Sequence, residues 1–152
     1  MNPLQIDLMD PAQANIQLSG EDRAAYARLA DVLIPAAEGM PSASEVDVHT
    51  RWVDQALRLR PDLRPFLLAA IAAAMDGGAP REVVVQLAEQ HPEVFAALGQ
   101  LTAGAYYMDD RVREAMGYPG QEARQLIDDT GEYLEMLERV VERGPIYRPT
   151  PQ

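Results

Sequence analysis

The sequence predicts an all-α fold, in which about five to seven helices form a single-domain bundle. Apolar residues recur at intervals of three and four over most of the chain, which is the spacing of one helix face. No segment shows sustained alternation of apolar and polar residues between hairpin turns, as a half-buried strand would. Prolines and glycines separate the periodic segments and mark where helices begin and end.

Two helices are predicted in the first part of the chain. The first spans 21–34, and a proline ends it. Ser19 and Asp22 at its start resemble a capping box with Asp in place of Glu. The second spans about 46–60, and Trp52 flanks its apolar face. The residues predicted to face inward are Tyr26, Leu29, Ala30, Leu33, Val46, His49, Val53, Ala56 and Leu57.

Four further segments have helical patterns. Segment 65–75 is apolar on nearly every side, so a helix there must be enclosed by other helices or by a partner. A shorter helix follows Pro80, and Pro92 fits the first turn of the next one. The last helix is predicted over about 129–143 with a charged outer face. The inward positions are Val84, Leu87, Ala88, Val94, Phe95, Leu98, Leu101, Thr102, Ala105, Tyr133, Leu134, Leu137, Val140 and Val141.

The two ends of the chain have a different composition from the middle. Residues 1–18 contain two prolines and an alternating apolar pattern, which predicts an extended N-terminal arm. Residues 144–152 contain three prolines and predict an extended tail. We therefore predict one helical domain over 19–143, and a chain of 152 residues is long enough to bury a stable core there.

Composition excludes several functional classes. There is no cysteine, which removes disulfides, thiol nucleophiles and cysteine-ligated metal centres. The net charge of −11 opposes binding to nucleic acid and to anionic membrane surfaces. The longest nearly pure apolar run, 66–75, is too short to cross a bilayer, so we expect no direct membrane insertion. No basic start precedes an apolar run, which predicts a cytoplasmic chain as written.

The sequence contains no signature of a cofactor or nucleophile site, such as a phosphate-binding glycine loop or a zinc-binding helix. His49 lies on an apolar stripe and is interpreted chiefly as a hydrogen-bonded core or interface residue, with a metal ligand or general base as alternatives. A third hypothesis is a small metal-dependent enzyme built on His49 with Glu45 or Asp54. A catalytic metal site usually needs three protein ligands, and only a partial set is suggested here. Asp109 is interpreted as the N-cap of a short helix that ends at Met116.

Segment 105–120 combines a helix stop with aromatic residues. Gly117 can adopt the left-handed conformation that ends a helix, and the following proline prevents its continuation. Tyr and Met are enriched where proteins meet other molecules. For Tyr107, Met108 and Tyr118 core and interface positions are both open, whereas Trp52 is interpreted as a core residue. The candidate partner surface comprises Tyr106, Tyr107, Met108, Tyr118 and Pro119.

Two motifs resemble the gluconate 2-dehydrogenase subunit 3 family. They are Leu29-Ala-Asp-Val-Leu-Ile-Pro35 and the pairing of Ala105-Tyr-Tyr with Gly117-Tyr-Pro-Gly120, and the likeness covers about 28–121. The resemblance implies a small subunit that stabilises and helps to mature a large FAD-dependent dehydrogenase of the glucose-methanol-choline type, often with a cytochrome c as electron acceptor. The matching positions are structural or interface residues: Leu33, Ile34, Pro35, Tyr106, Tyr107, Gly117, Tyr118, Pro119 and Gly120. We count Trp52 with the structural group.

These observations lead to one main expectation and one alternative. The chain is expected to be a noncatalytic accessory subunit with no cofactor of its own, while FAD and substrate oxidation belong to the partner. Family members commonly begin with a twin-arginine export leader; its absence here favours a cytoplasmic complex, and a removed leader would place the complex in the periplasm. The alternative is a free-standing helical homodimer that binds a small ligand.

Overall fold

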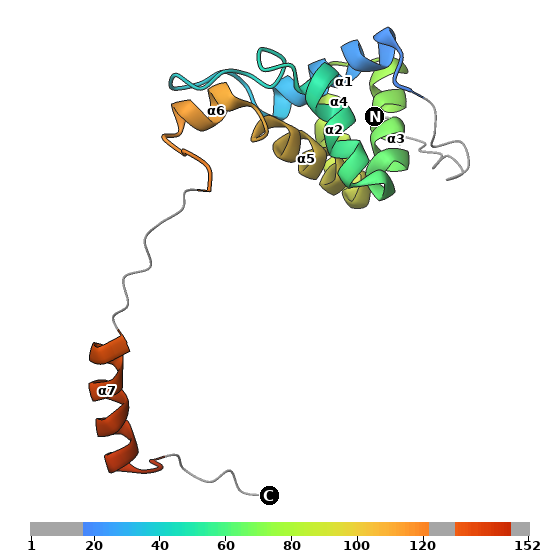
Figure 1. Ribbon diagram of the computed structural model, residues 1–152. Coiled ribbons are helices and arrows are strands. Elements are labelled where there is room, and N and C mark those ends of the chain that lie inside the picture. The colour runs from blue at the N-terminus through green and yellow to red at the C-terminus, as the bar shows by residue number, and fades with distance from the viewer. Residues whose placement is uncertain (1–16, 122–129, 147–152) are drawn as a thin grey trace, which may run out of the picture. The chain divides into compact units, whose positions relative to one another are not determined.

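The computed structural model describes residues 17–121 and 130–146 (Figure 1). Within this part of the chain the fold is all-α, as predicted, and contains no β-strand. The chain divides into two compact units, 1–120 and 121–152, which are described separately. The helices are α1 (Gly20–Leu33), α2 (Val53–Leu59), α3 (Arg64–Met75), α4 (Pro80–Gln90), α5 (Pro92–Tyr106), α6 (Asp110–Ala115) and α7 (Thr130–Arg143), with a π-helical turn η2 (Val48–Trp52) and a 3-10 turn η3 (Pro61–Leu63).

Helices α1 to α5 of the first unit enclose one apolar core. α3 packs against α1 and α5, while α4 packs against α1 and α5 (Figure 1). Most side chains of α3 are buried or half-buried, which agrees with a sequence that is apolar on nearly every side. The largest fully buried side chains are Tyr26, Leu29, Leu57, Leu67, Ile71, Leu87, Leu98 and Leu101.

Helix α1 begins at the predicted capping box. The Ser19 hydroxyl accepts a hydrogen bond from the Asp22 amide at 3.1 Å, and the Asp22 carboxylate accepts one from the Ser19 amide at 2.8 Å. The helix ends at Leu33, and Leu33 and Ile34 pack at the edge of the core while Pro35 is exposed. The structural role expected of Leu33, Ile34 and Pro35 stays a prediction.

The second predicted helix is shorter than expected. The sequence predicted one helix over about 46–60, but α2 begins only at Val53 and a π-helical turn precedes it. Asp47 has a left-handed backbone (φ 60°), and its carbonyl oxygen accepts hydrogen bonds from the amides of Thr50, Arg51 and Trp52. A regular helix cannot include a left-handed residue, so the helical segment starts only after Asp47, with η2 as its first turn and α2 following directly.

The inward face of α4 also differs by one position. Val84 and Leu87 are buried as predicted, whereas Ala88 is exposed and Val83 takes its place in the core. Helix α5 follows the prediction closely, because Val94, Leu98, Leu101, Thr102 and Ala105 are all buried.

Helix α7 belongs to the second unit, so the helical domain predicted over 19–143 is divided here into two units. Its apolar side chains were expected to face inward, yet those described are all more than half exposed. No other helix is present among the residues of this unit that the structure describes. Most of the predicted arm and tail lies outside the described residues.

Candidate interaction surface

The end of α6 is shaped by the predicted glycine stop. Gly117 has a left-handed backbone (φ 66°), its amide donates to the Glu114 carbonyl at 2.9 Å, and the Tyr118 amide donates to the Arg113 carbonyl at 2.8 Å. This pair of bonds is the Schellman motif, which satisfies carbonyls at the end of a helix. The motif turns the chain back on the last turn of α6 and places Tyr118 beside it.

Three large side chains at this turn are exposed. Tyr107, Met116 and Tyr118 have 53%, 55% and 53% of their surface accessible. With Arg113 they line an apolar pocket of about 320 Å³. Single exposed apolar residues are ordinary on protein surfaces, whereas a group of them around a hollow indicates a binding surface. We call these four residues the α6 patch.

Tyr106 lies beneath this patch and is not part of it. The sequence placed Tyr106 at the partner surface, but it is 3% exposed and its hydroxyl donates to the Pro41 carbonyl at 2.7 Å. Burial raises the pKa of its phenol. Consecutive helix residues point about 100° apart, so at the last turn of α5 Tyr106 faces the core while Tyr107 faces solvent. The prediction that Tyr106 contacts a partner is therefore corrected.

The two tyrosines nevertheless act together. Their ring centroids are 5.5 Å apart and the ring planes meet at 77°, an edge-to-face contact. The buried Tyr106 ring thus orients the exposed Tyr107 ring. Of the other predicted surface residues, Met108 is half-buried and Pro119 is exposed.

Asp109 fixes the start of α6. It is the N-cap of that helix, as predicted, and its carboxylate accepts from the Arg111 amide at 2.9 Å. The same carboxylate accepts from the Trp52 indole N–H at 2.9 Å and from the Arg111 guanidinium at 2.9 Å. Hydrogen bonding to the Arg111 guanidinium, chiefly, lowers the pKa of Asp109 from 3.8 to about 2, although burial opposes this shift.

Trp52 and Arg111 connect α6 to the loop before α2. Trp52 is half-buried at the edge of the core, and the Arg51 guanidinium lies 4.1 Å from the centre of its ring. Arg111 also donates to the Glu45 carbonyl at 3.0 Å and to the Asp47 carboxylate at 3.3 Å. These bonds hold the short helix, and with it the α6 patch, on the helical core.

Two of the three residues considered for catalysis, Glu45 and Asp54, are engaged in other interactions. The Glu45 carboxylate accepts from the Ser42 amide at 2.6 Å, and Asp54 binds the Arg23 guanidinium at 2.9 and 3.0 Å. The Nδ1 atom of His49 is buried without a hydrogen-bond partner among the described residues, so the predicted hydrogen bond is not found at this nitrogen. Within 17–121 and 130–146 no group of three or more His, Asp or Glu side chains is arranged to hold a metal ion.

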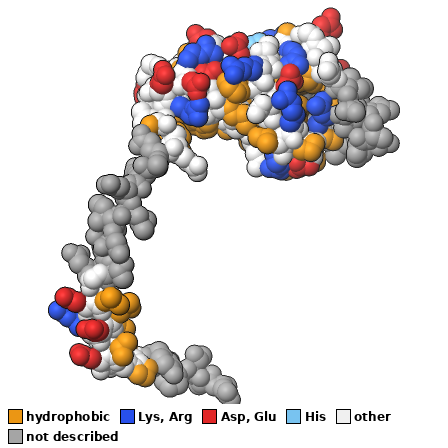
Figure 2. Space-filling view, in the orientation of Figure 1, with side chains coloured by type: hydrophobic (Ala, Val, Ile, Leu, Met, Phe, Trp, Pro, Cys, Tyr) orange, Lys and Arg blue, Asp and Glu red, His pale blue; other side chains and the backbone are white. Residues whose placement is uncertain are grey.

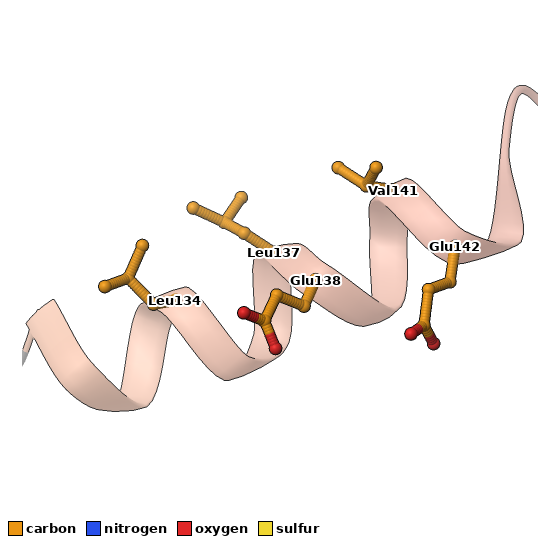
Figure 3. Close-up of a pocket in the computed structure, with 5 residues that line it drawn as sticks. All are labelled: Leu134, Leu137, Glu138, Val141 and Glu142. Carbon is orange, nitrogen blue, oxygen red and sulfur yellow. The ribbon is translucent and has the colours of Figure 1, made fainter.

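Helix α7 carries the second exposed apolar surface of the described chain. Leu134, Leu137 and Val141 form a hollow of about 290 Å³ together with two glutamates (Figure 3). Figure 2 shows hydrophobic side chains gathered along one side of this helix and charged side chains on another. None of the helices in the described part of the chain has the length and apolar character needed to span a membrane.

Comparison of the sequence with models of protein families, with curated proteins and with solved structures gives no match. The resemblance to the gluconate 2-dehydrogenase small subunits therefore rests on the two motifs. In the structure these motifs occupy the end of α1 and the segment that carries the α6 patch.

Proposed function

We propose that this chain is a noncatalytic accessory subunit that binds, stabilises and helps to mature an FAD-dependent sugar or polyol oxidoreductase of the glucose-methanol-choline type. FAD and the reacting groups belong to the large partner, and a cytochrome c is the electron acceptor that the family likeness suggests. The observation that carries the proposal is the α6 patch, an exposed aromatic and apolar group in the segment that bears the more specific family motif.

The construction of the patch supports a binding role. Tyr107 is oriented by a buried ring, and the turn that presents Tyr118 is closed by two backbone hydrogen bonds. A surface held in place before binding loses less conformational freedom on association. Tyrosine is also one of the residue types in which interface binding energy concentrates. The patch thus has the composition and the rigidity expected of an interaction site.

The test is co-expression with a glucose-methanol-choline type flavoprotein from the same organism, followed by affinity measurement on the purified chains. Tyr107→Ala and Tyr118→Ala are each expected to weaken the complex by about tenfold or more. Because both rings are about half exposed, the melting temperature of the free chain should change little. Val85→Ala, an exposed apolar residue on α4, is the matched control and should leave affinity unchanged.

The pocket of the α6 patch also supports the second candidate, a free-standing homodimer that binds a small ligand. Its volume of about 320 Å³ lies at the lower end of the range of small-molecule sites. A homodimer that persists on dilution in light scattering, together with no association with the flavoprotein, would favour this candidate over the accessory subunit.

A further inference from the structure

Helix α7 has an apolar face that is exposed among the described residues of its own unit. Figure 2 shows hydrophobic side chains along one side of the helix, and Figure 3 shows Leu134, Leu137 and Val141 on one face of it. Six large side chains of this helix are more than half exposed. At about 100° per residue they span an arc of roughly 160°. The six residues are Tyr133, Leu134, Met136, Leu137, Val140 and Val141. We call this surface the α7 face.

A helix with such a face requires a partner for stability. α7 has 14 residues, and isolated helices of about 12 to 15 residues are only marginally stable in water. Most helical stability in proteins comes from packing of the amphipathic face. We therefore expect the α7 face to be buried in the functional assembly.

The charges beside the face indicate the chemistry of that partner. Glu138 and Glu142 line the same hollow as Leu134, Leu137 and Val141 (Figure 3), so one edge of the apolar face is acidic. A groove that receives this edge is complementary when its rim carries arginine or lysine. An anionic bilayer is a poor match, because membrane-surface helices typically place basic residues along their polar face.

A second copy of α7 is also a poor match. Two facing helices bury a narrow seam of one or two positions per turn, whereas the arc of roughly 160° is wider. An antiparallel pair would also bring the acidic edges of the two copies together, and like charges repel. A groove formed by several elements of a larger protein covers a broad face better, as in the helix-in-groove mode of recognition.

We propose that α7 is a second docking element of this chain, whose apolar face lies in a groove with a basic rim on the same large partner that the α6 patch binds. This inference rests on the accessory-subunit function proposed above. Leu134 and Leu137 supply apolar anchors, while Glu138 and Glu142 pair with cations on the rim.

The test uses the full-length chain and the co-expressed flavoprotein, with the dissociation constant measured by biolayer interferometry. The double variant Leu134→Glu/Leu137→Glu is expected to weaken binding by about 30-fold or more, because it places charge in the apolar interface. The matched control is Glu135→Gln/Arg139→Gln on the polar face, which keeps the net charge and should bind like the original chain. Glu138→Arg/Glu142→Arg should weaken binding at low salt, and the difference should shrink at high salt.

Each outcome decides the inference. Loss of binding in the apolar variant with an unaffected control supports it. If the apolar variant binds normally while Tyr118→Ala is impaired, the α7 proposal is wrong and the accessory-subunit proposal stands. If the original chain does not bind the flavoprotein at all, the α7 proposal and the accessory-subunit proposal are both wrong. If light scattering instead shows an oligomer of the free chain that Leu134→Glu/Leu137→Glu converts to a monomer, a second copy occupies the face and the proposal is overturned.

Discussion

The clearest test of the structure concerns Asp109, because one carboxylate holds α6, Trp52 and Arg111 together. The Asp109 side chain is 7% exposed, but its partner Arg111 is 55% exposed, so solvent partly screens the ion pair. The fall of its pKa from 3.8 to about 2 corresponds to at most about 2.5 kcal/mol of stabilisation at neutral pH, at roughly 1.4 kcal/mol per unit, and solvent screening of Arg111 lowers this to about 2 kcal/mol. Asp109→Asn keeps the shape and removes the charge, so we expect a loss of up to about 2 kcal/mol.

Asp109→Ala should cost more, about 3 kcal/mol. This variant removes the helix cap and leaves the Trp52 indole N–H without its acceptor. Asp110→Asn is the matched control, because Asp110 is exposed and its ion pair with Arg113 lies at the surface. A change within about 0.5 kcal/mol is expected there. The free energy of unfolding is measured by urea denaturation monitored by circular dichroism.

The pH dependence of the unfolding free energy tests the stabilisation by the Asp109 carboxylate independently. The folded-state pKa of Asp109 is below its unfolded value, so the stabilisation is complete above pH 4 and is lost as pH falls toward 2. The difference between the original chain and Asp109→Asn should therefore shrink over this range. A difference that stays constant from pH 6 to pH 2.5, or equal stability of the two chains at pH 6, would refute the account of this carboxylate.

Two further predictions concern the segment around the patch. Gly117→Ala should destabilise the chain by about 1 kcal/mol in thermal unfolding, because alanine is strained at φ 66°. Gly104→Ala within α5 is the control and should be neutral or stabilising, because an added Cβ there meets no atom within 4 Å. Equal effects of the two substitutions would contradict this prediction. Tyr106→Phe should cost about 1 kcal/mol through loss of the bond to the Pro41 carbonyl, and an unfolding free energy equal to that of the original chain would show that this bond contributes nothing.

The local signals in the sequence predicted the fold well. The capping box at Ser19, the cap at Asp109 and the stop at Gly117 all occur in the structure where the sequence placed them. Each depends on residues within a few positions of one another, so a single sequence contains the whole motif. The same holds for the apolar stripe of α5.

The departures involve contacts between distant residues or single backbone angles. The left-handed backbone of Asp47 delays the start of the second predicted helix, and periodicity gives no sign of it. Arg111 joins Asp109 to a loop about 65 positions away in sequence, and sequence reasoning did not identify it. The pattern also could not decide which tyrosine of the pair faces solvent, because that depends on where the last turn of α5 meets the core.

Helix α7 illustrates a different limit of sequence reasoning. The 3.6-residue pattern correctly identified a helix and its apolar side, but it assigned that side to the core of the chain. An amphipathic pattern predicts that one face of a helix is buried, but it does not identify the partner that buries that face. In the structure the face is exposed within its own unit, and this observation led to the proposed docking role.

The central claim is that this chain binds and supports a flavoprotein. The most direct measurement is size-exclusion chromatography of the co-expressed pair, with flavin absorbance recorded across the peak and dehydrogenase activity assayed with and without this chain. The account predicts one yellow peak that contains both chains, with activity lost when this chain is omitted. Separate peaks and a fully active flavoprotein alone would contradict it.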